Sequence, residues 1–377
     1  MSGQAVRYIL KQFIFCVKSI SEIVTRSTFS TDDLVALLSS KGAEREILYA
    51  KARQVKESQT GSKIFFRGLI EISNICSKNC LYCGIRSSNP NVVRYDIPDE
   101  EILDVCRFAH EKRFASVVLQ SGEIQTKKFT KRIGRLLKKI KQLSNNELGI
   151  TLSCGEQSRE TYRHWFESGA HRYLLRIEST NRELYYKIHP DTPRHSYEKR
   201  VEALGILKDT GYQVGTGVMI GLPFQTVENL ANDLQFFKII DIDMCGMGPY
   251  IEHEHTPLYA SRNLLKSKQE RFNLSLNMIS TLRLLMPDIN IAAATALQTL
   301  DPLGREKALT VGANVIMPNL TPLKYRKEYL LYENKPCLDE DSEYAMQILE
   351  ERLISAGCEI GYGEWGDSKR FINRLKK

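Results

Sequence analysis

The sequence predicts an α/β fold, a closed (β/α)8 TIM-type barrel with an N-terminal helical extension and a C-terminal tail. Eight apolar, strand-like segments alternate with amphipathic helical patterns, which calls for a parallel sheet. An open doubly wound sheet usually has about six strands, so eight favour a closed barrel. The predicted strands are 65–73, 116–121, 149–154, 172–178, 213–221, 243–250, 289–296 and 314–319. The predicted helices are 99–113, 126–143, 158–168, 197–210, 226–239, 269–285 and 303–310.

The barrel accounts for residues 63–321. Residues 31–62 hold two helical patterns that precede the barrel, and residues 322–377 form a tail that we expect to pack on the barrel. Within the tail, 342–356 has a helical pattern and 360–371 is expected to be coil. Residues 1–30 contain four basic residues and one acidic residue, a composition typical of an organellar transit peptide or of an ordinary N-terminal helix.

The composition indicates a globular protein that works in a reducing compartment. The chain has 377 residues, of which 42% are hydrophobic, and no apolar run approaches the roughly 20 residues of a membrane span, so we expect no membrane association. Nine cysteines without an even framework argue against a disulfide scaffold. Six of them are scattered, and we expect each to be a small buried apolar residue: Cys16, Cys106, Cys154, Cys245, Cys337 and Cys358.

The net charge of +8 is unevenly distributed. Residues 127–141 carry eight basic residues and no acid, with apolar residues at helical spacing, which predicts an amphipathic helix with a basic outer face. Such a face is either simply solvated or a docking surface for an acidic partner such as an electron-donating ferredoxin. Nucleic acid is disfavoured, because no aromatic residues interleave with the basic ones.

Three cysteines stand in a C-x3-C-x2-C loop directly after the first predicted strand: Cys76, Cys80 and Cys83. Three thiolates on one loop can hold three irons of a [4Fe–4S] cluster and leave the fourth iron open. A structural zinc site needs four protein ligands, and no second C-x2-C or H-x3-H pair follows, so a zinc knuckle or a disulfide is the weaker alternative. The barrel fold puts this loop on the face where such barrels carry their chemistry.

Polar motifs also end other predicted strands. They are Ser121-Gly122-Glu123, Gly155-Glu156, Arg176 with Glu178, Gly221-Leu222-Pro223, and Thr295. A charged residue at the end of an apolar strand is costly unless it is paired or used. We therefore expect these residues to surround the cysteine loop.

The cysteine loop resembles the signature of the radical SAM superfamily, and its Tyr82-Cys83 ending strengthens the match. Five segments, in order between about residues 60 and 332, resemble the [FeFe]-hydrogenase maturase HydE family in the biotin synthase-like branch: ISNICSKNCLYCGIR, VVLQSGE, RYLLRIES, GLPFQT and NVIMPNLTP. The resemblance implies an enzyme that reductively cleaves S-adenosylmethionine (SAM) at a [4Fe–4S] cluster. It also implies a cysteine-bound iron dicarbonyl cyanide substrate on the way to the di-iron subcluster of the hydrogenase H-cluster.

The resemblance also suggests partners and a location. The substrate would come from the maturase HydG, HydF is a further maturation partner, and a reductant such as ferredoxin would supply electrons; no nucleic acid is expected. If residues 1–30 are a transit peptide, the protein is expected in a hydrogenosome, a mitochondrion-like organelle or a plastid, and otherwise in the cytoplasm.

Within this family resemblance, residue roles can be assigned around SAM. Arg176, Glu178 and Arg200 match SAM-contacting positions. From the chemistry of SAM, Glu123 suits its ammonium group, Arg176 or Arg200 its carboxylate, and Glu178 its ribose hydroxyls. The backbone around Tyr82 can meet the adenine edge, and Gly122 and Gly221 let main chain approach a ligand closely.

Six further residues match positions that face the substrate cavity in the family, although barrel packing explains each equally well: Gln120, Thr151, Arg172, Thr295, Met317 and Tyr325. Two departures stand out. The accessory-cluster pattern C-x7-C-x2-C keeps Cys337 but has Ala345 and Ile348 at its other positions, so we expect one cluster only. Phe224 replaces a glycine that is common after Gly-Leu-Pro.

Three alternatives remain open. Two are enzymes of the same branch, a methylornithine synthase-like mutase and a biotin synthase-like sulfur inserter. The third is a non-catalytic iron–sulfur scaffold, which would bind a cluster without cleaving SAM. The His253-Glu254-His255 segment is interpreted as a loop rather than a metal site.

Overall fold

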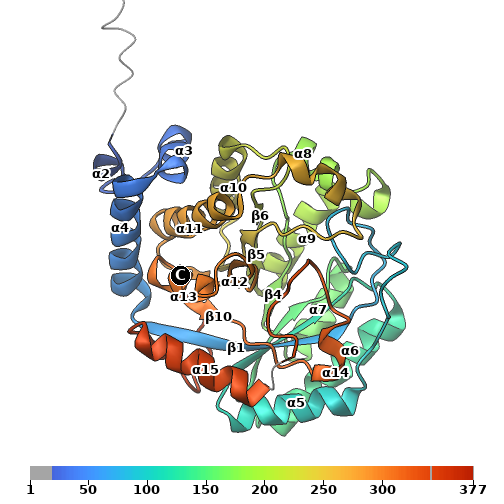
Figure 1. Cartoon of the computed structure of the whole chain (residues 1–377). Helices are drawn as coiled ribbons and strands as arrows, with labels where there is room; N and C mark the ends of the chain where they lie inside the picture. Colours follow the sequence, from blue (N-terminus) through green and yellow to red (C-terminus); the bar gives the residue numbers. More distant parts are fainter. Residues whose placement is uncertain (1–18, 340–341, 377) are drawn as a thin grey trace, which may run out of the picture.

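The computed structural model describes residues 19–339 and 342–376, and its centre is a ring of eight parallel strand positions (Figure 1). The strands pair in the order β10–β1–β2–β3–β4–β5–β7–β9. A bridge between Ala292 and Val315 joins the last strand to the first, and the Asn314 N–H donates to the Ile291 carbonyl at 2.9 Å. The predicted closed barrel is therefore confirmed. The strands are β1 (Lys63–Ser73), β2 (Ser116–Ser121), β3 (Gly149–Ser153), β4 (Arg172–Leu174), β5 (Gln213–Thr216), β7 (Met244–Cys245), β9 (Asn290–Ile291) and β10 (Val315–Ile316).

Seven helices follow these strands and begin and end within about two residues of the predicted bounds. They are α5 (Asp99–Glu111), α6 (Lys127–Leu143), α7 (Arg159–Glu167), α9 (Tyr197–Thr210), α10 (Val227–Ile239), α11 (Lys268–Leu285) and α13 (Gly304–Thr310). Side-chain caps fix several starts: the hydroxyls of Thr126, Ser158 and Thr226 each accept the backbone N–H three residues later, at 3.2 Å. Short helices that the sequence did not predict are α8 (Arg182–Ile188), α12 (Ala296–Leu300), α14 (Leu323–Arg326) and α16 (Lys369–Leu375), with 3-10 turns η1 (Pro193–His195) and η2 (Pro257–Leu264).

Several strands are shorter than predicted, for local backbone reasons. The predicted strand 172–178 ends at Leu174, and Glu178 has a left-handed φ of 68°. The predicted strands 213–221 and 243–250 each break in two, giving β6 (Met219–Ile220) and β8 (Gly248–Pro249). Between the halves the two backbones meet at glycines: a Cβ on Gly217 would lie 2.1 Å from the Gly246 carbonyl oxygen.

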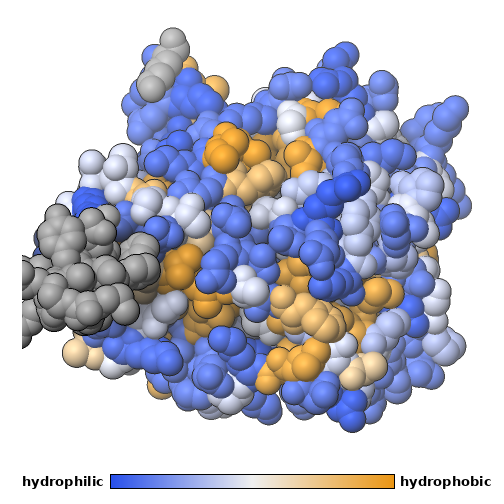
Figure 2. Space-filling model, turned by 90° about the horizontal axis from the view of Figure 1, so that it is seen from above, coloured by the Kyte–Doolittle hydropathy of each residue, from blue (hydrophilic) through white to orange (hydrophobic). Residues whose placement is uncertain are grey.

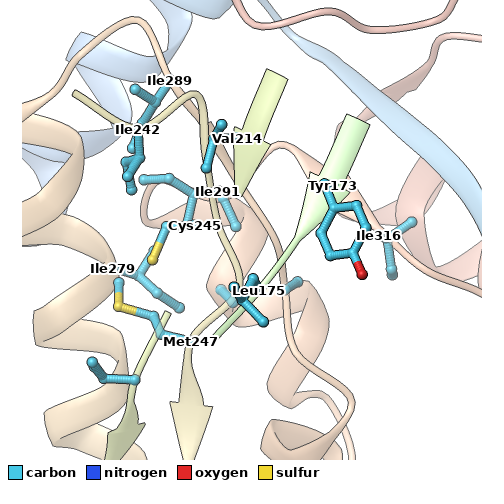
Figure 3. Packing of buried hydrophobic residues seen from close by; sticks show 14 of the residues in the cluster. Tyr173, Leu175, Val214, Ile242, Cys245, Met247, Ile279, Ile289, Ile291 and Ile316 are labelled. Atoms are coloured by element: carbon cyan, nitrogen blue, oxygen red, sulfur yellow. The ribbon is translucent and has the colours of Figure 1, made fainter. Parts of the chain in front are cut away.

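The hydrophobic core lies between the barrel and its helices. Figure 3 shows part of it, where Cys245 and Ile291 from the barrel lie near Ile279 of α11. Cys106, Cys154 and Cys245 are fully buried, as expected. Cys337 and Cys358 are only half-buried, which the sequence did not predict, and Cys16 lies outside the described residues.

The N-terminal extension packs on one side of the barrel. Its helices are α2 (Ile20–Ile23), α3 (Thr31–Ser39) and α4 (Gly42–Thr60), of which α3 and α4 pack against α11 (Figure 1). Residues between 20 and 29 contribute four side chains to the core: Ile20, Ile23, Val24 and Phe29. Of the predicted transit segment, residues 19–30 are therefore part of the folded body, and residues 1–18 lie outside the described residues.

The tail contacts both ends of the barrel. At the N-terminal end, β11 (Glu359–Ile360) pairs with the start of β1, and Asp367 forms an ion pair with Arg172 and accepts from Gln213 Nε2 at 2.7 Å. At the C-terminal end, Lys335 pairs with Glu71 at 2.5 Å. The predicted tail helix is present as α15 (Ser342–Ser355). The prediction of coil over 360–371 is wrong from residue 369 on, because α16 begins there.

The outer surface is mainly hydrophilic in the view of Figure 2, which looks down from the top of Figure 1, with hydrophobic side chains gathered in a few patches. Among the described helices, none has both the length and the apolar character needed to cross a bilayer.

Candidate active site

The three loop cysteines follow β1 at the C-terminal edge of the barrel. Two backbone N–H groups point at Cys76 Sγ, from Glu123 at 3.3 Å and from Lys78 at 3.4 Å. Burial raises the pKa of all three thiols, that of Cys80 to about 12, and the neighbouring cysteines raise the pKa values of Cys80 and Cys83 further. The three thiols are therefore uncharged at neutral pH in this setting. They become thiolates when a cation such as iron binds to them.

These residues fit a [4Fe–4S] cluster. They offer three soft ligands on one loop, and amide donors stabilise a thiolate at Cys76. In the described part of the chain no three His, Cys, Asp or Glu side chains converge on a point suited to one metal ion. Three thiols that each bind a different iron do not need to converge in that way.

Gly122 lets the end of β2 lie directly against the cysteine loop. A Cβ at this position would lie 2.3 Å from the Ile75 carbonyl oxygen and 2.8 Å from Cys76 Cβ. The Ser77 N–H donates to the Glu123 carbonyl at 2.8 Å, and the Gly122 N–H donates to the Ser73 carbonyl at 2.9 Å. Only glycine permits this approach, which places the Glu123 side chain beside the cluster loop.

Four buried charged side chains form an ion-pair network beside the loop: Lys78, Glu123, Glu156 and Arg200. Lys78 Nζ lies 3.2 Å from Glu123 Oε1 and 3.1 Å from Glu156 Oε2. Arg200 lies 2.5 Å from Glu156 Oε1 and 3.9 Å from Glu123 Oε2. Burial raises the pKa of Glu123 although Arg200 and Lys78 oppose the shift. Two carboxylates and two cations balance, so the network can receive a zwitterion without leaving a net buried charge.

Sequence reasoning placed Glu123 and Arg200 in the site and noted Glu156 only as a strand-end residue. Lys78 was missed. The available signal was a lysine lying between two cluster ligands, where the backbone position is fixed by the cysteines on either side.

Arg176 and Glu178, each predicted to contact SAM, form an ion pair with one another. Arg176 Nη2 lies 3.0 Å from Glu178 Oε2 and donates to the Val218 carbonyl at 3.0 Å, and Arg200 donates to the Arg176 carbonyl at 3.2 Å. Burial raises the pKa of Glu178. Both side chains line a cavity of about 110 Å³ together with Tyr82 and Cys83. The structure therefore brings the cysteine loop and this pair to one cavity, which Tyr332 of the tail also lines.

Gly221 is not part of this cavity. It has a left-handed φ of 78°, and a Cβ there would lie 2.8 Å from Arg271 Cγ. Its N–H donates to Gln225 Oε1 at 2.7 Å. In the structure this glycine serves a tight turn beside Arg271.

The six predicted substrate-facing residues are not gathered at one place. Gln120, near the end of β2, donates to the Tyr329 hydroxyl at 3.3 Å. Arg172 opens β4 at the opposite end of the barrel, where Asp367 pairs with it, and Tyr325 stacks on Tyr95 with ring centroids 4.9 Å apart. A sequence match gives a position along a strand but not the tail residue that packs against it.

The other three lie on barrel elements. Thr151 is fully buried on β3, and its hydroxyl has no hydrogen-bond partner among the described residues. Thr295 immediately precedes α12, and Met317 immediately follows β10, both half-buried.

The model of the radical SAM superfamily matches residues 70–237 of the chain. The chain is 41% identical over 359 residues to the [FeFe] hydrogenase maturase subunit HydE of Thermotoga maritima, covering 95% of this chain and 99% of that protein. It is 30% identical over 342 residues to 3-methylornithine synthase of Methanosarcina acetivorans, covering 90% and 92%. The crystal structure of methylornithine synthase PylB superposes with a TM-score of 0.77 at 25% identity, covering 92% of this chain and 98% of that one.

Proposed function

Because the chain belongs to the radical SAM superfamily and, within it, to the family of the [FeFe]-hydrogenase maturase HydE, we propose that it cleaves SAM at one [4Fe–4S] cluster held by Cys76, Cys80 and Cys83. The protein is an enzyme of this family and acts in [FeFe]-hydrogenase maturation. The observation that supports the proposed site is the meeting of three elements at one barrel edge: the cysteine loop, the ion-pair network, and the Arg176–Glu178 pair.

When bound, the reduced cluster supplies the electron that breaks the carbon–sulfur bond of SAM to give methionine and a 5′-deoxyadenosyl radical. The side chains and backbone of the protein bind and orient SAM. Glu123 would accept from the SAM ammonium group, and Arg200 or Arg176 would donate to its carboxylate. Glu178 would accept from the ribose hydroxyls, and the backbone at Tyr82 would meet the adenine.

The tail helps to exclude water from the site. Tyr332 lines the same cavity as Cys83, and the Gly84 N–H that follows the cluster loop donates to the Leu331 carbonyl at 2.9 Å. Closing a site in this way suppresses side reactions of reactive intermediates.

The substrate we propose is a cysteine-bound iron dicarbonyl cyanide unit. This proposal rests on membership of the HydE family, and we propose HydG and HydF as the partners in maturation. Gln120, Thr151, Thr295 and Met317 are the residues that we propose lie around it. We do not include Arg172 among them. It lies at the N-terminal end of the barrel, the barrel floor, where Asp367 already neutralises it.

The test is formation of 5′-deoxyadenosine by protein reconstituted without oxygen and given dithionite and SAM. We expect SAM consumption that increases when the cysteine-bound iron complex is added and that disappears in Cys80→Ala but not in the control Cys358→Ser. Cluster binding without SAM cleavage under any condition would instead identify a scaffold. SAM cleavage stimulated by lysine rather than by the iron complex would indicate a methylornithine synthase-like reaction.

We propose a single cluster and removal of an N-terminal leader. Iron analysis should give about four irons per chain, unchanged in Cys337→Ser, because Cys337 alone cannot hold a second cluster.

A leader that is cleaved for import into a hydrogenosome or a related organelle would have to end before Ser19, because Ile20 and Ile23 pack in the core. N-terminal sequencing of the mature protein tests this; a start at Met1 contradicts it.

A further inference from the structure

The outer face of α6 carries a cluster of exposed positive charge. Five exposed residues make up this basic face: Lys127, Lys128, Lys131, Arg135 and Lys138. The opposite side of the helix is buried, as predicted, through Phe129, Ile133, Leu136, Leu137 and Ile140. No ion pair joins any of the five to a described acidic side chain, whereas Arg132 pairs with Asp96 and Asp99 and Lys139 pairs with Glu100. The five residues of the basic face therefore have no ion-pair partner among the described residues, although other basic residues of α6 do.

A groove runs beside this face. It has a volume of about 610 Å³ and lies between the N-terminal halves of α6 and α7. Lys127 and Lys131 line it from α6, and His164 and Glu160 line it from α7. A docking protein can therefore meet a concave surface as well as a charged one.

The groove reaches the residues around the cluster loop. Gln125 lines it and donates through Nε2 to Glu123 Oε1 at 3.1 Å and to the Glu156 carbonyl at 2.8 Å. The Glu123 N–H in turn donates to Cys76 Sγ. Glu123 and Lys127 are four residues apart, so their Cα atoms are separated by at most about 14 Å. The basic face thus begins close to a proposed cluster ligand.

We propose that the basic face of α6 and its groove form the docking surface for an acidic protein electron donor, which reduces the cluster. This rests on the proposed function, which consumes one electron for each SAM cleaved. In the step, one electron passes from the donor, which is oxidised, to the cluster, which is reduced, and no covalent bond forms or breaks. Electron-transfer encounters are small and transient, and charge complementarity accelerates them.

The test uses two charge-reversal variants with the same change in net charge. The first is Lys127→Glu with Lys131→Glu and Arg135→Glu, on the basic face. The control is Lys41→Glu with Lys238→Glu and Lys268→Glu, three exposed lysines that form no ion pair with a described residue. All six side chains are exposed, so both variants should fold, which circular dichroism checks.

The probe is an acidic 2[4Fe–4S] ferredoxin. Its affinity for the unmodified chain should fall steeply with added salt, because the contact is electrostatic. We expect the basic-face variant to bind it at least about 10-fold more weakly at low salt and to lose the salt dependence, while the control stays within about 2-fold. SAM cleavage driven by reduced ferredoxin should fall in parallel, whereas cleavage driven by dithionite should not change.

Equal losses in the two variants would mean that net charge alone matters and would overturn the proposal. So would ferredoxin binding that is unchanged in the basic-face variant, or a loss confined to binding of a duplex RNA or DNA. Failure of dithionite-driven cleavage in the unmodified enzyme would instead contradict the proposed function, so the two failures are distinguishable.

Discussion

Replacing Lys78 with methionine should destabilise the protein by about 3 kcal/mol. Lys78 is only 3% exposed, and methionine fills nearly the same volume without the charge. Its ammonium group neutralises Glu123 at 3.2 Å and Glu156 at 3.1 Å. Breaking a buried ion pair by removing one partner typically costs about 3–5 kcal/mol, because the other charge stays buried.

The lower end of that range applies here because other partners remain. Glu156 keeps Arg200 at 2.5 Å. Glu123 keeps Arg200 only at 3.9 Å, but it also accepts the Glu156 N–H at 2.9 Å and Gln125 Nε2 at 3.1 Å. Glu123 is therefore the group whose free energy changes most when Lys78 is lost.

A double-mutant cycle measures this effect. Urea unfolding of the apoprotein would compare Lys78→Met, Glu123→Gln and the double variant. We expect Lys78→Met to cost at least about 1.5 kcal/mol less when Glu123 is already neutral. Iron retention after reconstitution is a second measurement, since Lys78 ties the cysteine loop to the ends of β2 and β3. An equal cost of Lys78→Met in both backgrounds would refute the ion-pair argument.

Three further outcomes follow from particular contacts. Asp367→Ala should destabilise the apoprotein by about 3–5 kcal/mol in urea unfolding, because it leaves Arg172 buried and unpaired; no change would contradict the assignment of a barrel-floor pair. Burial raises the pKa of Asp233 to about 7, so between about pH 4 and 7 the folded chain keeps a proton that the unfolded chain releases. Stability relative to Asp233→Asn should therefore fall as pH rises through this window, by on the order of 4 kcal/mol in total, and a pH-independent difference would refute this. Gly122→Ala should lose most of its iron after reconstitution, because the added Cβ meets the Ile75 carbonyl, whereas the control Gly205→Ala, with nothing within 4 Å, should retain it.

The elements that the sequence predicted are those specified by local patterns. The apolar spacing in 127–141 predicted the buried side of α6. The predicted helices 158–168 and 226–239 start at Ser158 and Thr226, whose hydroxyls cap the first turn. The cysteine loop was placed correctly after β1, since a barrel strand leads to its C-terminal loop.

The features that the sequence did not predict depend on pairs far apart in the chain. Arg172 and Asp367 are 195 residues apart, and Glu71 and Lys335 are 264 residues apart. No periodicity reports such a pairing. The predicted strand 172–178 was too long, because β4 ends at Leu174 and Glu178 has a left-handed φ of 68°, which is uncommon for a residue other than glycine.

The two long-range pairs give the tail a role that its sequence alone does not suggest. Lys335 reaches Glu71 at the C-terminal end of β1, and Asp367 reaches Arg172 at the N-terminal end of β4, so one segment contacts both ends of the barrel. Both pairs are largely buried, and the cost of removing each charge from water is offset only when its partner is present. The tail therefore has to be in place for these barrel charges to be tolerated, which couples folding of the tail to exclusion of water from the site that it covers.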